Sequence, residues 1–302
     1  MVLLGTAGAA PGQTASDAEL CANITGKPDL AIQHCTKAID SKRFSGELLA
    51  RLHYNRGFEL SAKGMHDLAI ADFDAAIRLH PRFADAYYTR GNAWGHKHDS
   101  DRAISDYDAA LRLNPKDKSA LGSRAFEWAI KGDYARAIAD HDAVVRLDAK
   151  DAIAYHGRGR ARFYTGDFAR AVPDLQEAMK LEPNSYTALW LYLARKRAGA
   201  EGEELLEQGT ADIRGGAWPW PVVVLFLGRT DVASVMAAAT DRDVVRQREQ
   251  LCEASFYVAH WYLLRNDRER ALPLLKDAQS GCPRDFLEHE GAVAELRRLQ
   301  KP

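Results

Sequence analysis

The chain has 302 residues, of which 46% are hydrophobic and 27% are charged, an ordinary composition for a globular protein. Its 41 Lys and Arg residues are balanced by 42 Asp and Glu residues, so the formal net charge is −1. A nucleic-acid-binding protein normally carries an excess of basic residues, so this balance argues against that class. The longest apolar run in the body of the chain, residues 222–227, is too short to span a bilayer, and no transmembrane helix is expected there.

The first 15 residues are apolar or small and carry no charge. They resemble the end of a secretory signal peptide without its basic N-terminal region, with Ala7-Gly8-Ala9 as an acceptable cleavage site. The alternative is a disordered cytosolic tail. Cys21 follows Ala18-Glu19-Leu20, and a glutamate there is wrong for a lipoprotein cleavage box, so no lipid anchor is expected on Cys21.

The four cysteines form two local pairs, Cys21 with Cys35 and Cys252 with Cys282. Local pairing and a secretion-like start favour two disulfide bonds in an oxidising compartment. The alternative is four buried free thiols that pack as small hydrophobic residues. A metal site at Cys21, His34 and Cys35 would have only three ligands, so we expect no metal.

An internal period of 34 residues relates four segments, 50–83, 84–117, 118–151 and 152–185. Three positions of the period hold small residues in nearly every segment. These are Gly57, Gly91, Ala125 and Gly159; Ala69, Ala103, Ala137 and Ala171; and Ala76, Ala110, Val144 and Ala178. A fourth position mostly holds a large side chain: Phe73, Tyr107, His141 and Leu175. Near the end of three segments stand Pro81, Pro115 and Pro183.

This pattern resembles the tetratricopeptide repeat (TPR), and the resemblance implies an all-α solenoid, a right-handed superhelix of helical hairpins. The small residues let the two helices of a hairpin approach closely, and the large side chain fills the volume between them. Gly64, Gly132 and Gly166 fall at the turn inside the hairpin, where a positive φ is expected. Proline ends the second helix because it cannot continue one.

The flanking segments follow the pattern less closely. We expect a shortened hairpin over residues 16–41, four repeats within 42–185, a divergent helical segment over 186–251, and a C-terminal repeat with a capping helix over 252–302. In that last repeat Cys252 begins the first helix and Cys282 ends the second. Antiparallel packing would therefore bring the two cysteines to the same end of the hairpin.

The C-terminal half carries a second resemblance. Its residues are the runs 189–194, 218–223 (Trp-Pro-Trp-Pro-Val-Val), 226–228, 256–257 and 286–289, with Leu263, Ala271, Glu295 and Leu296. Their order and spacing are similar to those of NlpI-type TPR lipoproteins of the Gram-negative envelope, over about residues 45–300. The resemblance implies an adaptor that holds peptidoglycan hydrolases and presents a hydrolase substrate to a periplasmic protease. The chain lacks the family's lipoprotein box.

No motif of a serine hydrolase, a nucleotide-binding loop or a zinc protease is present, and we expect neither a catalytic centre nor a cofactor. His289-Glu290 begins a zinc-protease pattern, but Val293 stands where the second histidine is needed.

Charged residues recur with the repeat. Arginine occupies one position (Arg56, Arg90, Arg124 and Arg158) and aspartate another (Asp72, Asp106, Asp140 and Asp174). One interpretation is a ladder that binds anions. The interpretation we favour is structural, because every arginine has an aspartate at the same spacing with which it can pair.

Partner binding is expected on the concave face, to which the fifth and ninth residues of each first helix contribute. The candidates are Tyr54, Phe58, Tyr88, Asn92, Phe126, His156, Arg160 and Trp190. Aromatic and arginine side chains are typical of surfaces that bind proteins or extended peptides. The alternative is that these aromatics are buried between neighbouring first helices.

The sequence therefore predicts a non-catalytic scaffold for protein partners, periplasmic or associated with the outer membrane. The alternative is an architectural or regulatory module of a cytoplasmic complex, and a homo-oligomer is left open.

Overall fold

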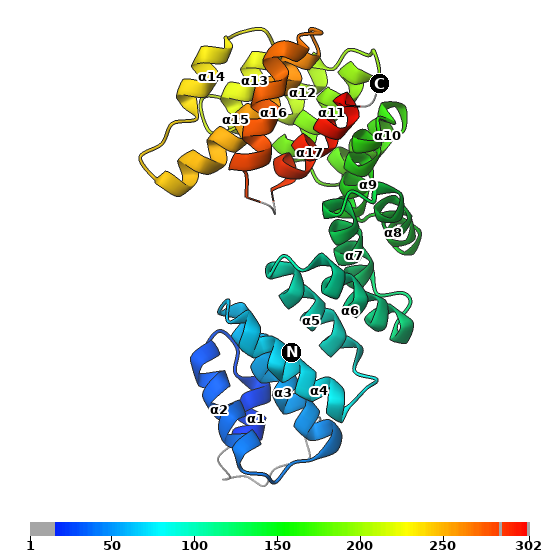
Figure 1. Ribbon diagram of the computed structural model, residues 1–302, viewed down its shortest axis with the longest axis vertical. Coiled ribbons are helices and arrows are strands. Elements are labelled where there is room, and N and C mark those ends of the chain that lie inside the picture. The colour runs from blue at the N-terminus through cyan, green and yellow to red at the C-terminus, as the bar shows by residue number, and fades with distance from the viewer. Residues whose placement is uncertain (1–15, 284–285, 301–302) are drawn as a thin grey trace. The chain divides into compact units, whose positions relative to one another are not determined.

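A computed structural model describes residues 16–283 and 286–300, which form seventeen α-helices, one short 3-10 helix and no strand (Figure 1). The prediction of an all-α fold is confirmed. Among these residues, no helix has both the length and the apolar character that crossing a bilayer requires. The interpretation of residues 1–15 lies outside the described residues and stays a prediction.

The chain divides into two compact units, Met1–Glu127 (unit 1) and Trp128–Pro302 (unit 2), and the division falls inside helix α7 (Lys118–Ile130). The preceding helices of unit 1 are α1 (Asp17–Asn23), α2 (Pro28–Asp40), α3 (Gly46–Ala62), α4 (His66–Leu79), α5 (Ala84–His96) and α6 (Ser100–Leu113). After α7, unit 2 contains α8 (Tyr134–Leu147), α9 (Ala152–Thr165), α10 (Phe168–Leu181), α11 (Ser185–Arg197), α12 (Glu203–Gly209), the 3-10 helix (Ala211–Ile213), α13 (Trp220–Phe226), α14 (Val232–Ala238), α15 (Val244–Leu263), α16 (Arg268–Gly281) and α17 (Leu287–Leu299).

The repeat pattern explains how the paired helices pack. A Cβ atom added to Gly57 on α3 would lie 2.8 Å from the ring of Phe73 on α4, closer than real Cβ contacts come. A Cβ atom added to Gly91 would lie 2.7 Å from the ring of Tyr107, and one added to Gly159 would lie 2.8 Å from the side chain of Leu175. Glycine is thus required on the first helix because the large residue of the second helix lies directly against its backbone.

The turn between the paired helices has a left-handed residue, as the sequence predicts. Gly64, Gly132 and Gly166 have φ values of 74°, 78° and 83°. His98 and Asn266 stand at the same point of their hairpins with φ values of 58° and 60°. The second helices α4, α6 and α10 each end at a leucine two residues before the repeat's proline. Local chemistry therefore determines both the turn and the end of the hairpin.

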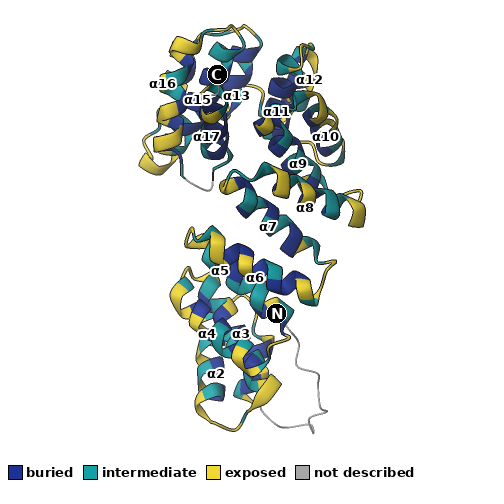
Figure 2. Ribbon diagram, turned by 45° about the vertical axis from the view of Figure 1, so that its right-hand side comes forward, coloured by how far each residue is buried: buried dark blue, intermediate teal, exposed yellow. Residues whose placement is uncertain are grey.

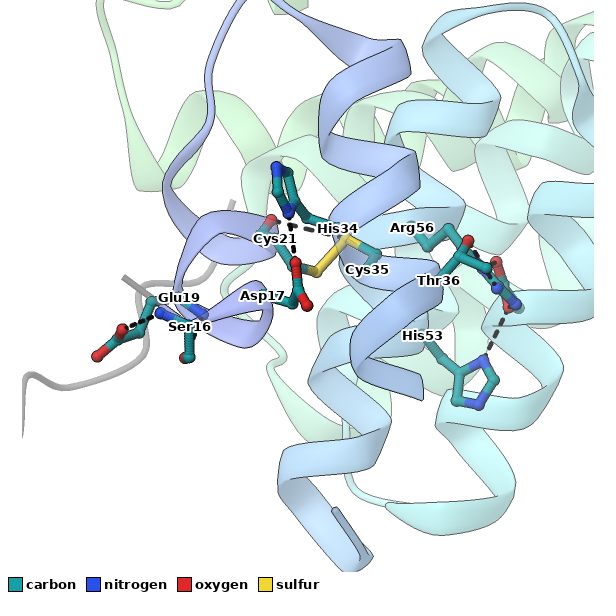
Figure 3. The surroundings of a disulfide bond; sticks show 10 residues. Ser16, Asp17, Glu19, Cys21, His34, Cys35, Thr36, His53 and Arg56 are labelled. Carbon is teal, nitrogen blue, oxygen red and sulfur yellow. Dashed lines mark hydrogen bonds and ion pairs between the residues drawn. A yellow bond between two sulfur atoms is a disulfide. The ribbon is translucent and has the colours of Figure 1, made fainter. Parts of the chain in front are cut away.

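The N-terminal hairpin of unit 1, α1 with α2, is covalently closed (Figure 3). Cys21 and Cys35 form a disulfide with a Cα–Cα distance of 4.6 Å. The Nδ1 atom of the neighbouring His34 lies 2.6 Å from a carboxylate oxygen of Asp17. Ser16 caps α1 by accepting a hydrogen bond from the backbone N–H of Glu19, whose carboxylate accepts one from the backbone N–H of Ser16.

Unit 2 has the larger apolar core. Buried residues of α11, α13, α15 and α17 dominate it (Figure 2), and Trp190, Phe256 and Tyr257 are fully buried there. A second disulfide, Cys252–Cys282, joins α15 to the residue that follows α16. Both cysteine pairs are thus bonded, and the free-thiol alternative does not describe this structure.

Helix α15 begins earlier than the expected repeat boundary at residue 252. It starts at Val244 because Asp243 accepts hydrogen bonds from the backbone N–H groups of Val245 and Arg246. The last residues of the expected divergent segment therefore belong to the first helix of the C-terminal hairpin. Val244 and Val245 are 80% and 66% exposed, so capping rather than burial accounts for this start.

Candidate functional site: two grooves built on the first helices

In unit 1, Tyr54 on α3 is part of the core and not of an open surface. It is 4% exposed, and its ring centroid lies 4.8 Å from that of Phe83 and 6.0 Å from that of Phe73. Burial raises the pKa of the Tyr54 hydroxyl, and Asp85 and Tyr88 raise it further. The assignment of Tyr54 to partner binding is therefore wrong, and the alternative of burial beside neighbouring helices holds for it.

Four other candidates of unit 1 remain accessible. Phe58 on α3 is 39% exposed, and Tyr88, Asn92 and Phe126 are half-buried. The hydroxyl of Tyr107 donates a hydrogen bond of 2.8 Å to Oδ1 of Asn92, which orients the amide and leaves its NH2 group as a donor. These four residues, Phe58, Tyr88, Asn92 and Phe126, are called the unit 1 face below. They offer aromatic surface and an amide but no charge.

In unit 2 the corresponding residues are covered by the chain itself. Arg160 is 6% exposed, and Trp190 is not exposed at all. His156 on α9 is half-buried, with its Nδ1 atom 2.9 Å from the hydroxyl oxygen of Thr187. Burial, together with nearby Arg160, lowers the pKa of His156 to about 3, so it is neutral at physiological pH. Arg160 and Trp190 are therefore buried rather than open, and their role in partner binding stays a prediction.

The covering element is α17, which packs on α9, α15 and α16 (Figure 1). A Cβ atom added to Gly291 would lie 2.7 Å from the ring of Phe256 and 3.2 Å from that of Trp190. The hydroxyl of Tyr164 donates to the carbonyl oxygen of Leu287 over 3.2 Å. Expected as a capping helix, α17 thus also packs against side chains of the first helices, among them Trp190 and Phe256.

Three glutamates of α17 are buried: Glu288, Glu290 and Glu295 are 4%, 6% and 4% exposed. Arg197 on α11 donates to Glu295 over 3.0 Å, and the hydroxyl of Tyr257 on α15 donates to Glu288 over 3.1 Å. Burial raises the pKa of all three carboxyl groups, that of Glu290 to about 7.

Sequence reasoning missed these buried glutamates, although a signal was present. Glu288 and Glu295 share a helical stripe with the small residues Gly291 and Ala292, at the spacing of a buried face.

A fourth buried carboxylate lies behind α17. Glu253 on α15 is 8% exposed and accepts hydrogen bonds from the indole Nε1 of Trp218 over 2.7 Å and from the hydroxyl of Tyr186 over 3.0 Å. Burial, with repulsion from Glu288, raises its pKa to about 7. Trp218 belongs to the Trp-Pro-Trp-Pro run, so that run is anchored to the core by a buried polar contact.

The recurring arginines are used internally, as the structural interpretation predicts. Nε and Nη2 of Arg90 donate to Asp106 of its own repeat over 2.8 and 2.6 Å, and its Nη1 donates over 2.5 Å to Asp74 of the preceding repeat. Arg158 has the same contacts with Asp174 and Asp142, and Arg124 reaches Asp108 over 2.5 Å. Arg56 pairs with Asp72 and donates to Thr36 on α2 (Figure 3). The arginines connect successive hairpins, and an anion ladder is not supported.

Comparisons with known proteins agree with this geometry. A family model described as tetratricopeptide repeat matches residues 54–118 and 96–152, and a second model with the same description matches residues 152–185. Together the two models match residues 54–185, which are thus similar to tetratricopeptide repeats. Repeats of this family are in general scaffolds for protein–protein interaction and not catalytic domains.

Several solved structures, two of them described as TPR proteins, resemble most of the chain. The C-terminal part of a TPR protein from Cytophaga hutchinsonii is 18% identical over 88% of this chain and 94% of that one, with a TM-score of 0.55. A TPR protein from Parabacteroides merdae is 18% identical over 90% and 93%, with a TM-score of 0.53. Pseudomonas aeruginosa PilF is 13% identical over 86% and 99%, with a TM-score of 0.50. At these identities the likeness concerns the fold alone.

Proposed function

We propose that the protein is a non-catalytic adaptor of the cell envelope that binds a segment of a partner protein on the unit 1 face. The observation that carries this proposal is the contrast in exposure at the ninth position of the first helices. Phe58 is 39% exposed in unit 1, whereas Arg160, at the same position in unit 2, is 6% exposed. Exposed aromatic side chains on a rigid TPR scaffold are the usual anchors of a protein interface.

The composition of this face indicates the chemistry of the partner segment. Phe58, Tyr88 and Phe126 offer aromatic surface to apolar side chains, and the amide of Asn92 offers a donor to a backbone carbonyl. The lysine and asparagine with which some TPR domains hold a terminal carboxylate are missing, because Tyr54 and Phe58 stand in their places. The proposed ligand is therefore an apolar internal segment and not an acidic C-terminus.

The two disulfides support an envelope location for this adaptor. Both join helices of one hairpin, at the first described hairpin of unit 1 and at the last hairpin of unit 2. Disulfides persist in the periplasm and are rare in the cytosol. Acid-quenched cells alkylated under denaturing conditions should yield a chain with no reactive thiol. Recovery of four alkylated cysteines would instead favour the cytoplasmic alternative.

Photo-crosslinking in living cells tests the binding face. A benzophenone amino acid placed at Tyr88 should crosslink a partner, whereas the same group at Leu68, which is 52% exposed on the second helix α4, should not. Adding Asn92→Ala and Phe58→Ala should reduce the yield from position 88 at least about tenfold while the circular dichroism spectrum is unchanged. Equal crosslinking from positions 88 and 68 would contradict the assignment of the unit 1 face.

A further inference from the structure

The floor beneath α17 has the features of a binding groove for a helix. It is formed by first helices of three hairpins, α9, α11 and α15, and contributes Arg160, Arg197, Trp190, Phe256 and Tyr257. Aromatic rings and guanidinium groups lie side by side on this floor, which is the composition of interface hot spots. In unit 2 the first helices therefore do contact a helix, and that helix belongs to the same chain.

The charges of the floor and of α17 are complementary. The floor supplies the guanidinium groups of Arg160 and Arg197, and α17 supplies the buried carboxyl groups of Glu288, Glu290 and Glu295. Steric fit centres on Gly291, where the absence of a side chain lets the helix backbone approach Trp190 and Phe256. The floor thus accepts a helix that has carboxylates on both sides of a small residue.

The fit of α17 is incomplete at one point. The shortest approach between Arg160 Nη2 and Glu290 Oε2 is 3.8 Å, which is too long for a hydrogen bond. Nε and Nη1 of Arg160 and both carboxylate oxygens of Glu290 are buried without a hydrogen-bond partner among the described residues. A helix that placed a carboxylate within about 2.9 Å of Arg160 would satisfy groups that α17 leaves unsatisfied.

We propose that this floor is a second interaction surface, that its occupant is an acidic amphipathic helix of a partner protein, and that α17 is a built-in competitor for the same place. The proposal goes beyond the adaptor role of the unit 1 face, since it concerns other helices and a different partner chemistry. Helix α16 ends at Gly281 and α17 begins at Leu287, so a short segment joins the two helices. Displacement of α17 from the floor would not break the α15–α16 hairpin, which the Cys252–Cys282 bond holds closed.

The partner helix is expected to share the features that seat α17. Carboxylates at the spacing of Glu290 and Glu295 would meet Arg160 and Arg197, and one at the spacing of Glu288 would accept a hydrogen bond from the hydroxyl of Tyr257. Glycine or alanine would face Trp190. An intramolecular competitor acts at a high effective concentration, so a free helix binds the wild-type protein weakly. Weakening α17 alone should raise the affinity for the free helix without changing the floor.

The test uses the full-length chain and a fluorescent peptide with the sequence of residues 286–300. Gly291→Leu lies in α17, not in the floor, and its side chain would clash with Phe256 and Trp190 and displace the helix. The peptide should bind this variant at least about tenfold more tightly than it binds the wild-type protein. Adding Arg160→Gln to the variant, or replacing the three glutamates of the peptide with glutamine, should abolish the gain.

Two results would overturn the proposal. One is a folded Gly291→Leu protein, with an unchanged helical content, that binds the peptide no better than wild type does. The other comes from the wild-type chain, which decides the matter even if the variant does not fold. If backbone amides of α17 exchange hydrogen as slowly as those of α15, the helix is a permanent part of the core and not a competitor. Faster exchange confined to α17 is the supporting outcome.

Discussion

Side chains at the same positions of the repeat differ in exposure between the two units. Tyr88 and Phe58 in unit 1 keep exposed surface, whereas Arg160 and Trp190 in unit 2 lie under α17. The repeat places each of these side chains on the same side of a first helix, so the repeat itself does not decide whether a partner can reach them. For Arg160 and Trp190 it is decided by an element outside the repeat pattern, the C-terminal helix, whereas Tyr54 of unit 1 is buried against Phe73 and Phe83.

The largest expected effect tests whether the covered groove is part of the core. Trp190→Ala removes a side chain with no exposed surface and should lower the free energy of unfolding by about 3–5 kcal/mol. Phe58→Ala is the matched change on the unit 1 face and should lower it by less than about 1 kcal/mol. Urea denaturation followed by circular dichroism measures both. Similar losses of unfolding free energy in the two variants would contradict the difference in burial between Trp190 and Phe58.

A second test concerns the pH dependence of α17 docking. Burial raises the pKa of Glu290 to about 7, and Glu288 raises it while Arg160 lowers it. A carboxyl group whose pKa is higher in the folded than in the unfolded state makes its full contribution to stability at pH values below the unfolded-state pKa. This contribution is lost as the pH rises through the folded-state pKa, here about 7. For Glu290 the loss amounts to roughly 3 kcal/mol. His141 and His156, whose pKa values burial lowers to about 4 and about 3, titrate with the opposite sign.

The difference between wild type and Glu290→Gln isolates the carboxyl group from the two histidines. Glutamine stays neutral, so the two proteins should differ least near pH 4.5. The variant should gain on the wild type as the pH rises toward 8, by up to about 3 kcal/mol, because the raised pKa of Glu290 already includes the attraction of Arg160 for the charged carboxylate. Urea unfolding at pH 4.5, 6 and 8 measures this gain. A difference that does not change with pH would show that Glu290 ionises as freely as on the surface.

The smallest expected effect concerns the arginine–aspartate pairs, which recur in both units. Arg90→Met should destabilise unit 1 by about 2 kcal/mol, because it leaves the buried carboxylate of Asp106 without its guanidinium partner. Arg51→Met, which removes an exposed pair with Glu47 on the same helix, is the control and should change stability by less than about 0.5 kcal/mol. Binding to the unit 1 face should survive both changes. Lost binding with unchanged melting would revive the anion ladder.

The hairpins could be predicted from the sequence because their determinants are local and recur. Gly57 and Phe73, or Gly91 and Tyr107, stand at a fixed spacing, and the left-handed turn and the closing proline follow from backbone chemistry. The exposure of the groove could not be predicted in this way. Whether Trp190 faces a partner or the core depends on Gly291, about 100 residues later in a segment that does not repeat.

The site was predicted in part for the same reason. Phe58, Tyr88, Asn92 and Phe126 keep exposed surface, and their role in binding stays a prediction. Arg160 carries the charge expected of a groove residue, but its counterpart Glu290 belongs to this chain. The stripe of Glu288, Gly291, Ala292 and Glu295 indicates a buried face, but the sequence does not identify the distant side chains that pair with its glutamates.

The positions of the two disulfides affect where the chain unfolds locally and becomes open to proteases. A linear array of hairpins is held mainly by contacts between nearest neighbours, so its terminal hairpins fray first and expose the chain to proteases. In this protein the first described hairpin, α1–α2, and the last, α15–α16, are each closed by a covalent bond. Reduction should therefore hasten proteolysis within these two hairpins, one in each unit, while the repeats between them in the sequence stay intact.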